Sequence, residues 1–263
     1  MLTVTSADGT SVALDRTGSG PPLILVSGAF ASRSDLAPFA QQLAPHFTVL
    51  AYDRRGRGES SDTAPYAVER EVEDIEALMA EAGGSAFAFG HSSGAVLALE
   101  AAAHNPAIAG LALYEPPFIV DDSRPAPPAD LATHLDRLVS DGRRGDAVEY
   151  WMRYAVEVPA EQIDQMRGSP MWPALEQVVH TAVYDATIMA DTMRGTPLPP
   201  HRWSSVTAPA LVMDGELSAP FQHHAVDQLV SVLPNAQRRT VAGATHSVAP
   251  QVLAPILVEF FAG

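Results

Sequence analysis

Apolar and polar positions along this chain follow two alternating patterns. Short continuous runs rich in Val, Leu, Ile and Ala are separated by longer stretches in which apolar residues recur every three or four positions. The first pattern is typical of strands buried on both faces, and the second of amphipathic helices. Their alternation predicts an α/β fold with a mostly parallel central sheet and helices on both faces.

The individual elements can be read from these patterns. Buried strands are predicted over 21–28, 47–53, 85–90, 108–116, 208–215 and 236–243. Helices are predicted over 68–84, 94–106, 221–233 and 248–263. Residues 2–18 are predicted to form an antiparallel hairpin that turns at Asp8-Gly9.

One long segment interrupts the alternation. Residues 120–201 contain no convincing buried strand, although 130–142 and 145–156 have helical patterns. Five of the eight methionines lie in this segment. We therefore predict an α/β core formed by 1–119 and 202–263, with a helical cap inserted at 120–201.

Composition excludes several classes of protein. Of the 263 residues, 47% are hydrophobic, yet no apolar run reaches the length of a membrane span. The sequence MLTVTSADGT lacks the basic and apolar regions of a signal peptide, so we expect a cytoplasmic protein with no membrane partner. The chain has no cysteine, which excludes disulfides, thiolate metal sites and cysteine nucleophiles.

The charge excludes further chemistry. The formal net charge is −15, and all 16 basic residues are arginine. An acidic protein repels phosphate backbones, so we expect no nucleic-acid partner. Without lysine there is no Schiff base, Ser-Lys dyad or P-loop lysine.

The most informative motif is Gly90-His91-Ser92-Ser93-Gly94, between a predicted strand and a predicted helix. A sharp strand-to-helix turn needs small residues two positions before and two positions after its central serine. Such a nucleophile elbow projects the serine oxygen from the edge of the sheet, next to a helix N-terminus. We predict that Ser92 is a nucleophile.

A serine nucleophile needs a base, and the chain has nine histidines. His246 lies just past the last predicted strand, in a loop that returns to the sheet edge carrying Ser92. We predict His246 as the general base. His91 is predicted to point away from the serine and pack on the sheet. Neighbouring His223 and His224 cannot share one helix face as metal ligands would.

An oxyanion hole needs two backbone donors. We predict the amide of Ser93, after the nucleophile, and the amide of Ala29, in the loop after the first long buried strand.

These features resemble the α/β-hydrolase fold superfamily, in its serine-nucleophile branch with a helical cap. The stretches that carry the resemblance are LILVSGAFASRSDLAPFA, VLAYDRRGRGESS, FAFGHSSGAVLALEAA, LVMDG and GATHSVAP. The resemblance implies acyl transfer to water, with no cofactor and no metal. One departure is Ser27-Gly28, where family members often have His-Gly; it removes a side chain from the oxyanion region but keeps the backbone donor.

The acid that orients His246 is a second departure. The usual family position falls here on Ser218, which carries no charge. Some related enzymes place a glutamate at the end of the strand after the nucleophile's helix, and Glu115 occupies that position here. We predict Glu115 as the acid, with Asp214 as the alternative.

Substrate contacts are predicted from the aromatic and methionine side chains of the cap. With Phe30 beside the oxyanion loop, Trp151, Met152, Tyr154 and Trp172 are predicted to line an apolar acyl pocket, as are Met166 and Met193. The alternative is that they only pack the cap helices together. The expected substrate is a small molecule with an apolar acyl group.

Three functions remain open from the sequence. The first is hydrolysis of a carboxylic ester, thioester or lactone through an acyl-enzyme. The second is other chemistry on the same residues: C–C bond hydrolysis, cofactor-free perhydrolysis or biosynthetic cyclisation. The third is a non-catalytic binding protein, but the presence of both Ser92 and His246 argues against it. The sequence gives no oligomeric state.

Overall fold

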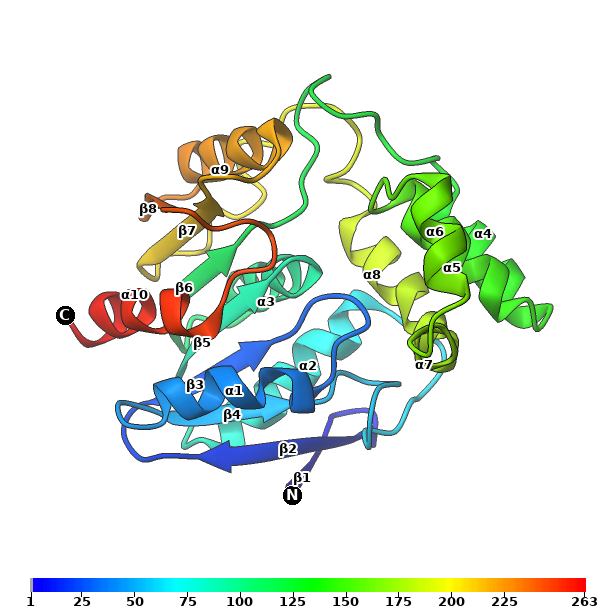
Figure 1. Cartoon of the computed structure of the whole chain (residues 1–263). Coiled ribbons are helices and arrows are strands. Elements are labelled where there is room, and N and C mark those ends of the chain that lie inside the picture. The colour runs from blue at the N-terminus through cyan, green and yellow to red at the C-terminus, as the bar shows by residue number, and fades with distance from the viewer. Residues whose placement is uncertain (1) are drawn as a thin grey trace.

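The computed structural model describes residues 2–263 and has one central sheet (Figure 1). Its strand order is β1-β2-β4-β3-β5-β6-β7-β8. The pairs β1–β2 and β2–β4 are antiparallel, and the other five pairs are parallel. The strands are β1 (Leu2–Thr5), β2 (Ser11–Thr17), β3 (Pro22–Val26), β4 (Thr48–Tyr52), β5 (Ala86–His91), β6 (Ile108–Tyr114), β7 (Ala210–Gly215) and β8 (Ala236–Val241).

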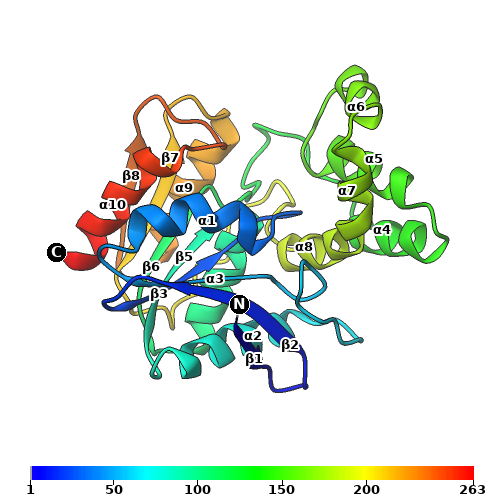
Figure 2. The same ribbon diagram turned by 60° about the horizontal axis from the view of Figure 1, so that its bottom comes forward.

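Helices cover both faces of this sheet, as the apolar patterns predict. The helices of the core are α1 (Arg33–Leu43), α2 (Val68–Glu81), α3 (Ser93–His104), α9 (Pro220–Val232) and α10 (Pro250–Ala262). Helices α1 and α10 pack on one face, and α2, α3 and α9 pack on the other (Figure 2). Alternate residues of β3 contact opposite layers: Ile24 faces α2 and α3, whereas Leu25 faces α1 and α10. The predicted fold class is confirmed.

Helix α1 is the one core helix that the apolar pattern does not predict. The Ser32 backbone N–H donates to the Asp35 carboxylate at 2.8 Å, which stabilises the first turn. Pro38 lies inside the helix, where it removes a backbone donor. Burial of Phe39, Ala40 and Leu43 against the sheet offsets this loss.

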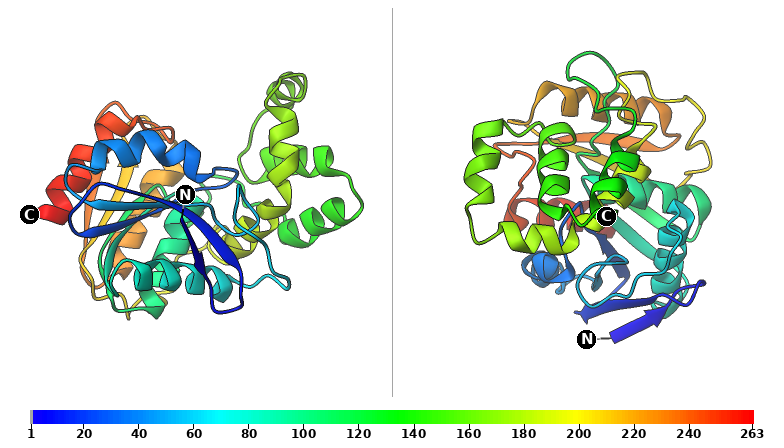
Figure 3. Two further views of the ribbon diagram at one scale, coloured as in Figure 1. Left: turned by 90° about the horizontal axis from the view of Figure 1, so that it is seen from below. Right: turned by 90° about the vertical axis from the view of Figure 1, so that its right-hand side faces the viewer.

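A second group of helices lies between β6 and β7. It consists of α4 (Leu131–Ser140), α5 (Arg144–Tyr154), α6 (Ala160–Arg167), α7 (Trp172–Val178), the 3-10 helix η1 (Val179–Thr181) and α8 (Ala182–Met189). Helix α8 contacts α2 and α3 of the core, and the others extend to one side of it (Figure 3). Within the described residues, no strand occurs between β6 and β7. These helices fall inside 120–201, the segment that we propose as a cap.

Within residues 2–263, no helix is both long and apolar enough to cross a membrane.

Candidate active site

Three predicted catalytic residues meet at the carboxyl edge of the parallel strands. Ser92 follows β5, Glu115 follows β6, and His246 lies in the loop between β8 and α10. The Ser92 amide donates to the Tyr114 carbonyl at 3.0 Å, and the Glu115 amide donates to the Met213 carbonyl at 2.9 Å. These bonds fix both residues at the point where side chains leave the sheet.

The backbone at Ser92 forms a strained turn. Its φ is +55° and its ψ is −128°, a conformation that L-residues rarely adopt. A Cβ atom on Gly90 would lie 2.4 Å from the Gly94 carbonyl oxygen, and one on Gly94 would lie 2.3 Å from the Val26 carbonyl oxygen. The two flanking positions therefore require glycine, as a nucleophile elbow does.

His246 and Glu115 form a direct pair. The Nδ1 atom of His246 lies 2.7 Å from Oε2 of Glu115, whose side chain is completely buried. Because an ionised carboxylate only accepts hydrogen bonds, Nδ1 carries the proton and Nε2 is left as an acceptor. Glu115 has a φ of +48°, so a second strained residue borders the same edge.

The carboxylate of Glu115 is stabilised by several donors. The Gly215 amide donates to Oε1 at 2.7 Å, and the Ser218 hydroxyl donates to the same oxygen. Burial acts to raise the pKa of Glu115, but the hydrogen bonds from His246, Ser218 and Gly215 outweigh it and hold the pKa below its usual range. Glu115 therefore remains ionised beside His246.

Ser218 and Gln222 are site residues that the sequence analysis did not identify as such. From the sequence, Ser218 is only an uncharged residue at the usual acid position, but in the structure it donates a hydrogen bond to Glu115. Gln222 Nε2 lies 2.5 Å from Oε2 of Glu115 and 2.9 Å from Nδ1 of His246. Gln222 comes from α9, so its contact with Glu115 depends on how that helix packs against β7 and β8.

The alternative acid, Asp214, is wrongly placed to orient His246. Its buried carboxylate contacts Nδ1 of His223 at 2.6 Å and also pairs with Arg238. As a strand residue, Asp214 directs its side chain to the face opposite that of its neighbours. Its partners lie on α9 and β8, not in the loop of His246.

His91 contacts the loop of His246, which the sequence does not indicate. Its ring is 4.7 Å from that of His246 between centroids, and its Nε2 is 3.1 Å from the His246 carbonyl oxygen. Its ring also lies 5.8 Å from that of Tyr114 on β6, so it packs on the sheet as predicted, but it borders the cavity of Ser92 as well. Burial, together with the nearby His246, lowers the pKa of His91 to about 4. Neutral His91 and the Tyr114 hydroxyl, which donates to the Thr245 carbonyl at 2.7 Å, hold the backbone around His246.

The predicted oxyanion donors lie beside Ser92. Ala29 and Ser93 line the same cavity as Ser92 and His246. Next to Ala29, Phe30 has a φ of +62°. Of the four non-glycine residues with positive φ in the described chain, three therefore border this site.

A buried arginine holds the loop of Ala29. Arg57 donates through Nη1 to the Gly28 carbonyl at 2.6 Å. This carbonyl belongs to the same planar peptide as the Ala29 N–H, so the bond also fixes the direction of that N–H. Arg57 is held in turn by Asp185 of α8 at 2.6 Å and by Thr181 at 3.1 Å. Neither Arg57 nor Asp185 belongs to a local sequence motif that indicates this role.

One cavity of about 510 Å³ contains Ser92 and His246. Such a volume suits a small-molecule ligand. Of the residues predicted as substrate contacts, Phe30, Trp151, Met152 and Met193 line it.

The predictions for Tyr154, Trp172 and Met166 are wrong for this cavity, because none of the three lines it. Tyr154 packs on Tyr150 with 4.6 Å between ring centroids and borders a separate hollow. Trp172 is buried and donates from Nε1 to Glu176 at 2.8 Å. Both aromatic side chains therefore interact within their own helices and do not face Ser92.

Within residues 2–263, no group of three or more His, Cys, Asp or Glu side chains is arranged to hold a metal ion.

The chain is similar to several known hydrolases. A crystal structure of an alpha/beta hydrolase from Sphaerobacter thermophilus is 52% identical, with a TM-score of 0.91, over 99% of this chain and 100% of that one. A 2-(acetamidomethylene)succinate hydrolase from Mesorhizobium japonicum is 28% identical over 92% of this chain and 88% of its own length.

A shorter match is to a pimeloyl-[acyl-carrier protein] methyl ester esterase from Xanthomonas campestris. It is 37% identical over 101 residues, which are 38% of this chain and 38% of that esterase. The model of the alpha/beta hydrolase family matches residues 23–255. The chain therefore belongs to the alpha/beta hydrolase family.

Proposed function

We propose that this protein is a serine hydrolase that cleaves a carboxylic ester, thioester or lactone through an acyl-enzyme. The observation that carries the proposal is the buried, ionised Glu115 at 2.7 Å from Nδ1 of His246, at the cavity that holds Ser92 in its strained turn. The order serine, acid, histidine along the chain is that of other hydrolases with this elbow.

The proposed mechanism assigns one role to each group. His246 Nε2 accepts the proton of Ser92 as its Oγ attacks the substrate carbonyl, and Glu115 stabilises the imidazolium that forms. The amides of Ala29 and Ser93 donate to the oxyanion; losing one such donor typically raises the barrier by about 3–4 kcal/mol. His246 then protonates the leaving group, and a water molecule activated by His246 releases the acid.

The similar proteins support hydrolysis without fixing the bond that is cleaved. One relative is a methyl ester esterase and another is a 2-(acetamidomethylene)succinate hydrolase. The arrangement of Ser92, His246 and Glu115 favours attack on a carbonyl carbon, and an ester is the simplest carbonyl substrate with which to test it.

The experiment is hydrolysis of short-chain p-nitrophenyl esters by the wild-type protein and by Ser92→Ala. We expect turnover in the wild type and its loss in the variant, with unchanged circular dichroism. Labelling of Ser92 by a fluorophosphonate without ester turnover would instead favour C–C bond hydrolysis, perhydrolysis or cyclisation. Absence of both labelling and turnover would favour a binding protein.

A further inference from the structure

The wall of the active-site cavity has a charge opposite to that of the protein as a whole. The chain carries a formal charge of −15, yet none of the described residues that line this cavity is Asp or Glu. Its ionisable lining residues are His91, His246 and Arg124. Arg124 is the permanent cation among them, because a guanidinium keeps its proton at neutral pH.

Arg124 is fixed in the wall of the cavity. Its side chain is only 5% exposed, and Nη2 donates to the Ala155 carbonyl at 2.7 Å. Its guanidinium carbon lies 4.7 Å from the centre of the Phe221 ring, and Phe221 and Ala155 also line the cavity. The group is therefore held in place on an apolar surface, and little conformational entropy remains to be lost when a ligand binds.

The charge of Arg124 is only partly compensated. Glu157 Oε2 lies 2.8 Å from Nε, but the Nε hydrogen is not directed at it, and the Glu157 side chain is 42% exposed. Within residues 2–263, Nη1 makes no hydrogen bond. Burial lowers the pKa of Arg124 by more than Glu157 raises it, so the cation is less stable here than in water. A second anion bound in the cavity would therefore stabilise the Arg124 cation.

We propose that Arg124 binds a carboxylate of the substrate, separate from the acyl group that Ser92 attacks. This inference rests on the proposed function and names its substrate class: a small molecule with an apolar body and one anionic end. A guanidinium can donate two parallel hydrogen bonds to a carboxylate, and Nη1 has donors to spare. Trp151, Met152 and Met193 would contact the apolar body.

Binding can be tested without turnover in a Ser92→Ala background. Isothermal titration with glutarate, a dianion, should give a lower dissociation constant than titration with pentanamide, a neutral molecule of the same chain length. Arg124→Met should weaken glutarate binding by roughly ten- to a hundredfold, the range for a hydrogen-bonded charge pair, and should reduce the difference between the two ligands.

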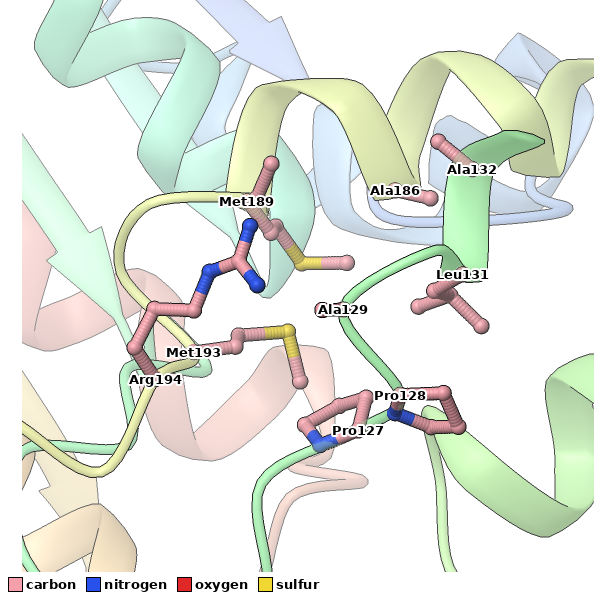
Figure 4. A pocket seen from close by; sticks show the side chains of 10 residues that line it. Pro127, Pro128, Ala129, Leu131, Ala132, Ala186, Met189, Met193 and Arg194 are labelled. Carbon is pink, nitrogen blue, oxygen red and sulfur yellow. The ribbon is translucent and has the colours of Figure 1, made fainter. Parts of the chain in front are cut away.

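Arg194 provides a matched control. It is exposed and has neither a hydrogen bond nor an ion pair within the described residues. It borders a smaller hollow that shares Met189 and Met193 with the active-site cavity (Figure 4). Arg194→Met removes the same charge from the same region, and it should leave glutarate binding within about twofold, because an exposed charge interacts weakly.

Kinetics provide a second readout. In the wild type, kcat/KM should be higher for mono-p-nitrophenyl glutarate than for p-nitrophenyl pentanoate. Arg124→Met should lower kcat/KM for the anionic ester and leave that for the neutral ester within about threefold. Equal losses on both esters, or glutarate affinity unchanged in Arg124→Met, would overturn the proposal.

Glu157→Gln keeps the proposal testable if Arg124→Met does not fold. It retains Arg124 and removes its charge partner, so glutarate should bind several-fold more tightly; unchanged or weaker binding would contradict the proposal. Failure of the serine mechanism is separately visible: the wild type would show no ester turnover, or Ser92→Ala would keep it, whereas glutarate binding in Ser92→Ala needs Arg124 and not the Ser92 hydroxyl.

Discussion

Replacing Glu115 by Gln tests which carboxylate orients His246. The substitution keeps the size of the side chain and removes its charge. The Gly215 amide and the Ser218 hydroxyl both donate to Oε1, so the new amide must present its oxygen to them and its NH₂ group to His246. An NH₂ group cannot accept the Nδ1 proton. The imidazole proton then moves to Nε2, and His246 can no longer accept the proton of Ser92.

The expected loss of acylation rate in Glu115→Gln is large. The same change of tautomer in a serine protease lowers kcat by ~10⁴, which corresponds to about 5 kcal/mol in the barrier. Asp214→Asn is the matched comparison, because Asp214 is equally buried but contacts His223 and Arg238. It should reduce stability by about 1–3 kcal/mol, the range for a charged hydrogen-bond partner, and leave kcat of the folded protein within about threefold.

The assay is the rate of acylation by p-nitrophenyl acetate in stopped flow, with thermal unfolding measured on the same samples. The reasoning is refuted if Glu115→Gln keeps its acylation rate within tenfold of the wild type. It is equally refuted if Asp214→Asn loses as much as Glu115→Gln while remaining folded.

Three further predictions concern residues that lie near Ser92, His246 or the cavity. Arg57→Met should lower kcat on p-nitrophenyl acetate by roughly tenfold or more, up to the ~3–4 kcal/mol that one oxyanion donor contributes. The control is Arg55→Met: Arg55 is equally buried but pairs with Asp74 and Asp8, so this variant should lose stability and little kcat. Equal kcat losses in the two variants would mean that Arg57 only supports the fold. The free energy of unfolding should fall as pH drops from 6.5 to about 4, because the unfolded chain binds a proton that the folded His91 does not. His91→Asn should remove this pH-dependent part of the free energy of unfolding, which is at most about 3 kcal/mol. Urea titrations at pH 7 and 4.5 that show the same pH dependence in the wild type and in His91→Asn would contradict this prediction. Trp151→Ala should change the preference across p-nitrophenyl esters of increasing acyl length more than activity on the acetate, and an unchanged preference would show that Trp151 only packs the helices.

The sheet could be predicted from the sequence because its parallel strands are buried on both faces. Runs such as 21–28 and 108–116 contain β3 and β6 to within two residues at each end. Helix α1 cannot be predicted in this way, because its stretch RSDLAPFAQQL mixes five polar residues with six apolar ones and contains Pro38, so its helical state depends on packing against the sheet.

Some residues of the site could likewise be predicted from the sequence, and others could not. Ser92 and Glu115 could be predicted because each directly follows a strand whose end lies at the carboxyl edge of the sheet. Gln222 and Glu115 are 107 positions apart, and Arg57 and Asp185 are 128 positions apart. No local sequence pattern predicts contacts between residues so far apart, because they arise from the packing of α9 and α8 against the core. Tyr154 and Trp172 were assigned to the pocket by residue type alone, which does not distinguish a lining side chain from a packing one.

Covalent capture of the substrate's acyl group tests the central claim most directly. The wild-type protein would be mixed with a p-nitrophenyl ester, quenched in acid within milliseconds, digested and analysed by mass spectrometry. The acyl-enzyme mechanism predicts a mass increase equal to one acyl group on the peptide that contains Ser92, at a level that rises in the first turnover and disappears in Ser92→Ala. Steady ester turnover with no adduct, or an adduct on another residue, would contradict it.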